Sequence, residues 1–156
     1  MSKSLQEKSM TRAFTLPSNE LAYFIGYTLI HADRVVLVSP WLSDVELRFP
    51  VNDQTSSREL LLSEAVAELT DTSITFLING NEDHNDYIKS RVERNAKVID
   101  VSDLHAKAVI TDDWIYAGSA NITRRGLLVN RELCKVVTNA HSDVNTYVKE
   151  ELDIDL

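Results

Sequence analysis

The chain alternates between segments with a helical spacing of apolar residues and short runs of consecutive apolar residues. Residues 18–33 place Leu21, Ile25 and Leu29 on one stripe, which predicts an amphipathic helix capped by Ser18. The valine-rich run 34–40 predicts a buried strand that ends at Pro40. By the same criteria we expect strands at 73–79, 97–101, 105–111, 114–120 and 132–138, and helices at 81–95 and 142–152.

Two segments have no clean period. Residues 1–16 are polar with mixed charges, and we expect them to form a flexible arm ahead of a single domain at 17–156. Residues 41–56 contain Pro50 and predict a long loop, a kind of segment that often carries function. Ser56 and Glu59 have the spacing of a capping box, which predicts that a helix begins there, with Leu61, Ala65 and Leu69 on its apolar face.

The order of these elements predicts the fold class. Strands and helices alternate in the first part of the chain, and consecutive strands with one closing helix follow. This order predicts an α/β sandwich, in which a mixed sheet is covered by helices on both faces. A chain of 156 residues is long enough to bury such a core without disulfides. The single cysteine, Cys134, lies in an apolar run and is expected to be a core thiol.

Charge and hydropathy narrow the function classes. The formal net charge of -8 disfavours general electrostatic binding of nucleic acid, so a polyanion would have to meet a local basic patch or a partner. One such cluster follows the motif region described next: Arg124, Arg125, Arg131 and Lys135. No apolar run reaches the roughly 20 residues of a membrane span, and the first residues have no signal core, so we expect a cytoplasmic protein.

The candidate catalytic side chains are concentrated in residues 105–121, "HAKAVITDDWIYAGSAN". In a strand, alternate residues share a face, so His105 and Lys107 are expected to project together, as are Ser119 and Asn121. Small neighbours such as Gly118 allow a ligand or another backbone to approach closely. An imidazole, an ammonium, an amide and a hydroxyl can bind and attack a phosphoryl group, while a carboxylate orients the imidazole.

These residues resemble the motif of the phospholipase D superfamily. His105, Lys107 and Asp112 have the spacing H-x-K-x4-D, and Gly118, Ser119 and Asn121 resemble its G-S-x-N element. The stretch "NITRRGLLVNRE" that follows resembles the part of these proteins that ends in an N-x-E acid, here Glu132. The resemblance covers roughly residues 18–156. One departure is that five residues separate Asp112 from Gly118, whereas many members have six.

The resemblance implies roles for single residues and a reaction without metal or cofactor. His105 would be the nucleophile that forms a covalent phosphohistidine. Lys107 and Asn121 would bind the nonbridging phosphate oxygens, Ser119 would help to position the site, and Glu132 would hydrogen-bond the catalytic imidazole. Asp112 and Gly118 would serve the structure of the motif.

The resemblance also implies an oligomeric state. The mechanism uses one histidine to attack and a second to protonate the leaving group. This chain has one motif, and His31, His84 and His141 have no lysine at the required spacing. We therefore expect a two-fold symmetric homodimer with one composite active site. Compact bacterial members with a single motif resemble this chain.

The leading functional hypothesis is a metal-independent phosphodiesterase that acts on nucleic acid as an endonuclease, with DNA favoured over RNA. Arg124 and Arg125 are candidates for a substrate phosphate track. The excess of acidic over basic residues favours a nuclease subunit whose substrate is delivered by a partner, such as a DNA-translocating ATPase in a prokaryotic defence complex.

Two alternatives belong to other classes. A phospholipase or transphosphatidylase would require an apolar surface at the site, for which Trp41, Leu42 and Phe49 in the predicted loop are the candidates. A non-catalytic dimeric scaffold would have no need for His105, Lys107, Asn121 and Glu132, and its biology would not change on His105→Ala.

Overall fold

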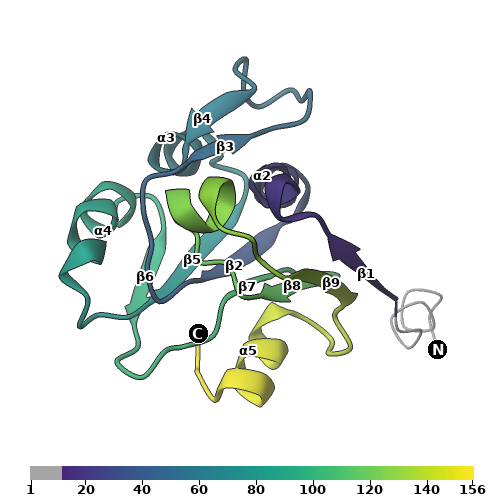
Figure 1. Ribbon diagram of the computed structural model, residues 1–156, viewed down its shortest axis with the longest axis vertical. Helices are drawn as coiled ribbons and strands as arrows, with labels where there is room; N and C mark the ends of the chain where they lie inside the picture. Colours follow the sequence, from purple (N-terminus) through teal and green to yellow (C-terminus); the bar gives the residue numbers. More distant parts are fainter. Residues whose placement is uncertain (1–11) are drawn as a thin grey trace.

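A seven-stranded mixed sheet forms the centre of the protein in a computed structural model that describes residues 12–156 (Figure 1). The strand order is β1-β9-β8-β7-β2-β5-β6. The strands of the parallel part are β2 (Arg34–Val38), β5 (Ser73–Ile78) and β6 (Lys97–Asp100). The antiparallel part comprises β7 (Ala108–Ile110), β8 (Trp114–Gly118), β9 (Cys134–Thr138) and β1 (Ala13–Leu16).

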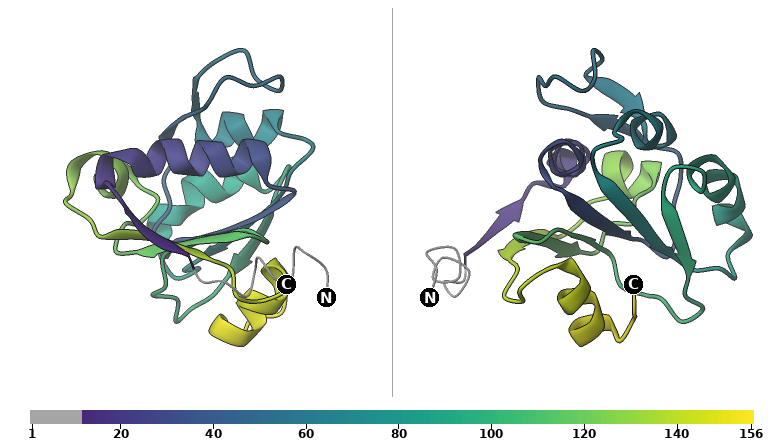
Figure 2. Two further views of the ribbon diagram at one scale, coloured as in Figure 1. Left: turned by 90° about the vertical axis from the view of Figure 1, so that its right-hand side faces the viewer. Right: turned by 180° about the vertical axis from the view of Figure 1, so that it is seen from behind.

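Helices cover both faces of this sheet (Figures 1 and 2). Helices α2 (Leu21–His31), α3 (Leu62–Glu68) and α4 (Asp86–Val92) lie on one face, and α5 (Val144–Leu152) lies on the other. The predicted α/β class with a mixed, doubly covered sheet is confirmed. Shorter elements are the 3-10 turns η1 (Ser18–Glu20) and η2 (Asp83–Asn85), the π-helical turn η3 (Arg125–Val129), and a separate hairpin of β3 (Glu46–Arg48) and β4 (Glu59–Leu61).

Strand alternation divides the core into two clusters. Strand β2 lies between β5 and β7, and four of its five residues are buried because both its faces are covered. In β7, Val109 faces the α2–α3–α4 side, whereas Ala108 and Ile110 face the α5 side. Tyr116 pairs with Val109 in the neighbouring strand and faces the α2–α3–α4 side with it. The odd-numbered residues of the β7 segment therefore face the larger helical layer.

Several predicted boundaries are wrong for identifiable reasons. Residues 13–16 of the predicted flexible arm form the edge strand β1, because β9 offers them a free edge; residues 1–11 of that arm lie outside the described residues. The predicted loop 41–56 contains β3, whose Leu47 is buried. The helix predicted to begin at Ser56 begins at Leu62, because residues 59–61 pair with β3, and the Glu64 carboxylate accepts from the Leu61 amide instead.

The strands around the motif are shorter than predicted. Strand β7 begins at Ala108 rather than at residue 105, since its partner β2 ends at Val38 and Pro40 follows with no amide to donate. Strand β8 ends at Gly118, although the Ser119 amide still donates to the Leu133 carbonyl at 3.0 Å. His105 and Lys107 therefore lie in the segment that leads into the sheet.

Cys134 provides a test of the core. Its side chain is buried against Tyr116, and burial raises the pKa of its thiol. Because the thiolate is the reactive form, the folded protein should react with a thiol-specific disulfide reagent at about pH 8 far more slowly than the protein in urea. Cys134 is the single cysteine of the sequence, so the chromophore released reports on it alone. Equal rates in the two conditions would contradict the buried position.

Gly126 provides a test of the π-helical turn η3. A Cβ atom there would overlap the Asn121 carbonyl oxygen, which belongs to the backbone and cannot rotate away as a side chain could. We expect Gly126→Ala to lower the free energy of unfolding by about 1–3 kcal/mol in urea titrations, because the turn must shift. Glu150 on α5 is exposed and lies away from this turn, so Glu150→Ala is the control, with an expected effect within about 0.5 kcal/mol. Equal losses would refute the close approach.

Candidate active site

The motif residues meet at one end of the sheet, where β2 and β5 end and where β7 begins. Val38 pairs with Ala108, and Ala108 pairs with Ala117, so Lys107 lies between the residues that follow β2 and those that end β8. The Gly118 amide donates to the Lys107 carbonyl at 3.3 Å. Residues from four separate segments of the chain thus converge at this end of the sheet.

His105 and Lys107 are neighbours at the site. The Lys107 ammonium donates to the His105 carbonyl oxygen at 3.2 Å, which keeps the cation beside the histidine. The His105 residue is exposed, and its imidazole has no hydrogen-bond partner among residues 12–156. The ring is therefore accessible to a substrate or to a second chain.

Ser119 and Glu132 are joined across the ends of β8 and β9. The Ser119 hydroxyl donates to the Glu132 carboxylate at 2.7 Å and accepts from the Leu133 amide at 2.9 Å. Gly118 is required beside them, since a Cβ atom there would overlap the Leu133 carbonyl. In the single chain the hydrogen bond of Glu132 goes to Ser119, and none joins it to His105.

Asn121 is held by the segment that follows β2. Its Oδ1 atom accepts from the Trp41 amide at 3.5 Å and lies 3.4 Å from the Ser39 hydroxyl, whose single proton it shares with the closer Trp41 carbonyl oxygen. The Ile122 amide donates to Ser39 Oγ at 2.9 Å, and the Ser43 amide donates to the Ile122 carbonyl at 3.0 Å. Because Oδ1 is the acceptor in these bonds, the Nδ2 group of Asn121 is left to donate to an anion.

Tyr116 supports the same segment from inside the core. Its hydroxyl accepts from the Ala120 amide at 3.3 Å and contacts the Ala120 carbonyl at 3.5 Å. Burial raises the pKa of this phenol, so the hydroxyl stays protonated. Sequence reasoning missed both Tyr116 and Ser39. The sequence did contain a signal for Ser39. It is a hydroxyl residue that directly follows a buried strand and precedes Pro40, and polar residues at the end of a buried strand often belong to a site.

The remaining predicted residues divide between the two ends of the sheet. Arg124 and Arg125 are exposed and follow the Asn121 segment directly. Asp112 lies at the opposite end of β7, where its carboxylate accepts from Arg34 at 3.1 Å and from the Val144 amide at 2.9 Å. The structure thus brings together His105, Lys107, Ser119, Asn121 and Glu132, and it places Asp112 at the start of α5.

One further histidine lies beside the site. His84 stacks on Trp41, with ring centroids 5.2 Å apart and planes inclined by 25°, and its Nε2 is 2.8 Å from the Ser43 hydroxyl. The other two histidines lie elsewhere: His31 contacts Tyr27 on α2, and His141 pairs with Glu151 of α5 at 3.0 Å. Of the predicted apolar loop residues, Leu42 and Phe49 are buried and Trp41 is 47% exposed.

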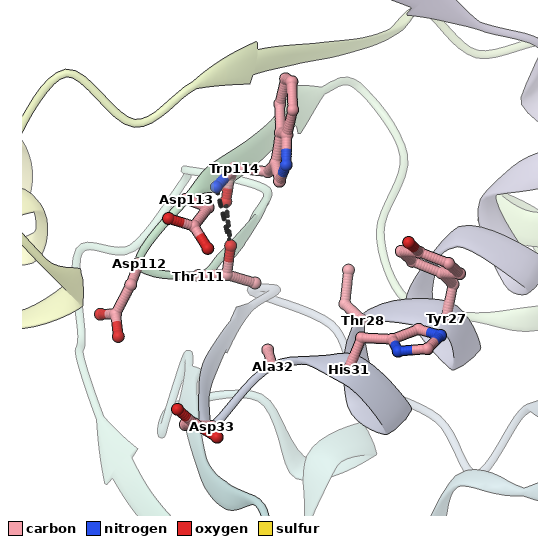
Figure 3. Close-up of a pocket in the computed structure, with 9 residues that line it drawn as sticks. All are labelled: Tyr27, Thr28, His31, Ala32, Asp33, Thr111, Asp112, Asp113 and Trp114. Atoms are coloured by element: carbon pink, nitrogen blue, oxygen red, sulfur yellow. Dashed lines mark hydrogen bonds between the residues drawn. The ribbon is translucent and has the colours of Figure 1, made fainter. Parts of the chain in front are cut away.

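A pocket of about 220 Å³ lies at the far end of the sheet (Figure 3). It is lined by the end of α2 and the turn between β7 and β8, with the carboxylates of Asp33, Asp112 and Asp113 opposite the rings of Tyr27 and His31. The pocket and His105 lie at opposite ends of strand β2, and a strand of five residues is roughly 17 Å long. This pocket is therefore separate from His105 and Lys107, although the motif's Asp112 lines it.

Clustered metal ligands and membrane-spanning helices are both absent from residues 12–156. Among residues 12–156, no group of three or more histidine, cysteine, aspartate or glutamate side chains is arranged to hold a metal ion. None of the helices in that same range is both long enough and apolar enough to cross a membrane.

Solved structures share this fold. Nuc, a phospholipase D family member from Salmonella typhimurium, aligns with a TM-score of 0.55 at 13% identity, over 92% of this chain and 90% of its own. NucT from Helicobacter pylori aligns with a TM-score of 0.51 at 14% identity, over 92% of each chain. TrmBL2, an archaeal chromatin protein whose structure shows a novel mode of DNA binding, aligns with a TM-score of 0.50 at 10% identity, over 91% of this chain and 50% of its own.

Sequence comparison gives the family. A search of curated proteins found no match. The family described as "Cardiolipin synthase, PLD-like domain" matches residues 51–156, a range that contains every residue of the motif and well over half of the chain. With this match, the motif at one end of the sheet and the shared fold, the chain belongs to the phospholipase D superfamily.

Proposed function

We propose that the protein is a metal-independent nuclease that cleaves phosphodiester bonds of nucleic acid through a phosphohistidine intermediate. The observation that carries this proposal is the convergence of an accessible imidazole, a cation and a fixed amide donor at one end of the sheet. Lys107 and Asn121 Nδ2 would bind the nonbridging oxygens and stabilise the charge that develops on them. Similar folds in Nuc, NucT and the DNA-binding TrmBL2 support nucleic acid as the substrate.

The reaction has two steps. His105 attacks phosphorus, the P–O bond to the leaving group breaks, and a second imidazole in its protonated form gives its proton to the leaving oxygen. That second imidazole, now neutral, takes a proton from water as the water attacks phosphorus and the P–N bond breaks. The products are a phosphomonoester and a free hydroxyl, and both histidines regain their starting states.

The second imidazole is proposed to be the partner subunit's His105 in a two-fold homodimer. An apolar surface around the site supports this assembly: Leu128, Val129 and Leu133 are 61%, 55% and 82% exposed in the single chain. Exposed apolar side chains of this size, grouped beside a charged site, are typical of an interface. Glu132 keeps one carboxylate oxygen outside its bond to Ser119, and we assign that oxygen to orienting an imidazole.

Charge favours a role inside a larger assembly. The net charge of -8 disfavours binding along a long stretch of nucleic-acid backbone, because the phosphates are repelled. Arg124 and Arg125 are the exposed cations closest in sequence to Asn121. We propose a cytoplasmic nuclease subunit that acts on DNA delivered by a partner, such as a DNA-translocating ATPase of a prokaryotic defence complex. A phospholipase is the alternative. It is less well supported because two of its three candidate loop residues, Leu42 and Phe49, are buried, and because the exposed Leu128, Val129 and Leu133 are assigned to the dimer interface.

The first test is nuclease activity in EDTA. Wild-type protein should cleave supercoiled plasmid or single-stranded oligonucleotides without metal, and His105→Ala should lose on the order of 10³-fold or more of that rate, because the attacking group is gone. His141 on the other side of the molecule gives the matched control, and His141→Ala should cleave like wild type. Equal cleavage by His105→Ala would overturn the assignment, and cleavage of phospholipid alone would favour the alternative.

The second test is subunit mixing. If each active site uses one histidine from each subunit, a dimer with one His105→Ala chain is inactive. Coexpression at three mutant chains to one wild-type chain should then leave about one sixteenth of the wild-type rate per chain pair, since only wild-type pairs act. Independent subunits would retain about one quarter. A linear dependence on the wild-type fraction would rule out the shared site.

A further inference from the structure

Trp41 and His84 form an exposed aromatic pair next to the residues that bind phosphate in the proposed function. Their rings stack at 5.2 Å, and the Ser43 hydroxyl fixes the imidazole through Nε2 at 2.8 Å. Trp41 remains 47% exposed. Since His84 lies against one face of the indole, a base would stack on the other face or extend the stack from the exposed imidazole.

The buried side chain of Asn85 fixes the position of this pair. Asn85 is buried; its amide group donates to the Pro40 carbonyl at 2.7 Å and to the Asn79 carbonyl at 2.9 Å, and its Oδ1 accepts from the Leu42 amide at 2.8 Å. These bonds hold the backbone on both sides of Trp41. Because Asn85 directly follows His84 in the chain, the same residue also fixes the position of His84. An exposed ring with a rigid backbone loses little conformational entropy when a ligand stacks on it.

The pair adjoins the phosphate site. The Trp41 amide lies 3.5 Å from Asn121 Oδ1, so the indole begins one side chain away from the amide that would hold the phosphate. A nucleotide has the same arrangement, with its base one sugar away from its phosphate. Stacking on aromatic rings is the common way in which proteins hold unpaired bases.

Charge indicates which part of a nucleotide fits here. Glu82 and Asp83 precede His84 in the chain and Asp86 follows it, so a phosphate group beside the aromatic pair would meet carboxylates. A neutral base meets no such repulsion. We infer that Trp41 and His84 form a stacking platform for one unpaired nucleobase next to the scissile phosphate, which makes single-stranded nucleic acid the substrate class; this inference rests on the proposed nuclease function.

The test separates binding from cleavage. Chains carrying His105→Ala, with or without Trp41→Ala, are titrated with a short oligodeoxythymidylate and with an abasic oligonucleotide of equal charge. Stacking is worth about 1–3 kcal/mol per base, so Trp41→Ala should weaken binding of the oligodeoxythymidylate by about 5- to 150-fold and leave binding of the abasic strand unchanged. Trp41→Phe, which keeps a ring, should restore most of the loss, and His84→Ala should weaken binding in the same direction.

Trp114 supplies the control. It is the second tryptophan of the sequence and lines the pocket at the far end of the sheet. Trp114→Phe should bind and cleave like wild type, and it leaves Trp41 as the single indole, whose fluorescence should be quenched by the oligodeoxythymidylate and not by the abasic strand. Equal quenching by both strands, or unchanged affinity in Trp41→Ala, would overturn the inference.

Cleavage assays distinguish failure of the inference from failure of the proposed function. If wild type and Trp41→Ala cleave oligonucleotides with the same KM, the nuclease function stands and the platform is refuted. If the Trp114→Phe chain neither binds nor cleaves nucleic acid but binds anionic phospholipid vesicles with a shift of its Trp41 fluorescence, both are refuted. A raised KM for single strands in Trp41→Ala, with little change for duplex, supports the platform.

Discussion

The buried hydroxyl of Ser39 is the contact on which the geometry of the site depends. The sheet fixes the chain as far as Val38 and from Ala108 onward, yet the site is built from residues just beyond these ends. A buried hydroxyl must be hydrogen-bonded, and Ser39 meets this requirement with the Trp41 carbonyl, the Ile122 amide and Asn121 Oδ1. One side chain thus joins the end of β2 to the segment that presents Asn121.

Close backbone approach completes the support. Gly118 and Gly126 occupy positions where a Cβ atom would overlap a carbonyl oxygen of Leu133 or Asn121. The Tyr116 hydroxyl contacts Ala120 from the core side. These contacts fix the backbone around Asn121, and Ser39 and Trp41 hold its side-chain Oδ1, which is the preorganisation that binding of a developing anion requires.

The single chain supplies half of the groups that the proposed reaction uses. It presents one accessible imidazole at the motif, and the apolar side chains of Leu128, Val129 and Leu133 remain exposed beside it. Both features have one explanation if a second copy covers the apolar surface and brings its own histidine. The acidic balance of the chain fits a site that recognises one phosphate and one base closely rather than a long track of phosphates.

The sequence by itself determined the fold class, most of the elements and the motif, because apolar periodicity and the spacing of His105, Lys107 and Asn121 are local properties of the chain. It did not determine that residues 13–16 complete the sheet or that residues 46–48 and 59–61 pair, since short strands are stabilised by partners distant in sequence. Only the tertiary structure decided that Glu132 bonds Ser119, that Ser39 holds Asn121, and that Trp41 stacks on His84. Each of these contacts joins separate segments at the end of a sheet, and their approach is set by strand order and packing, which no local pattern encodes.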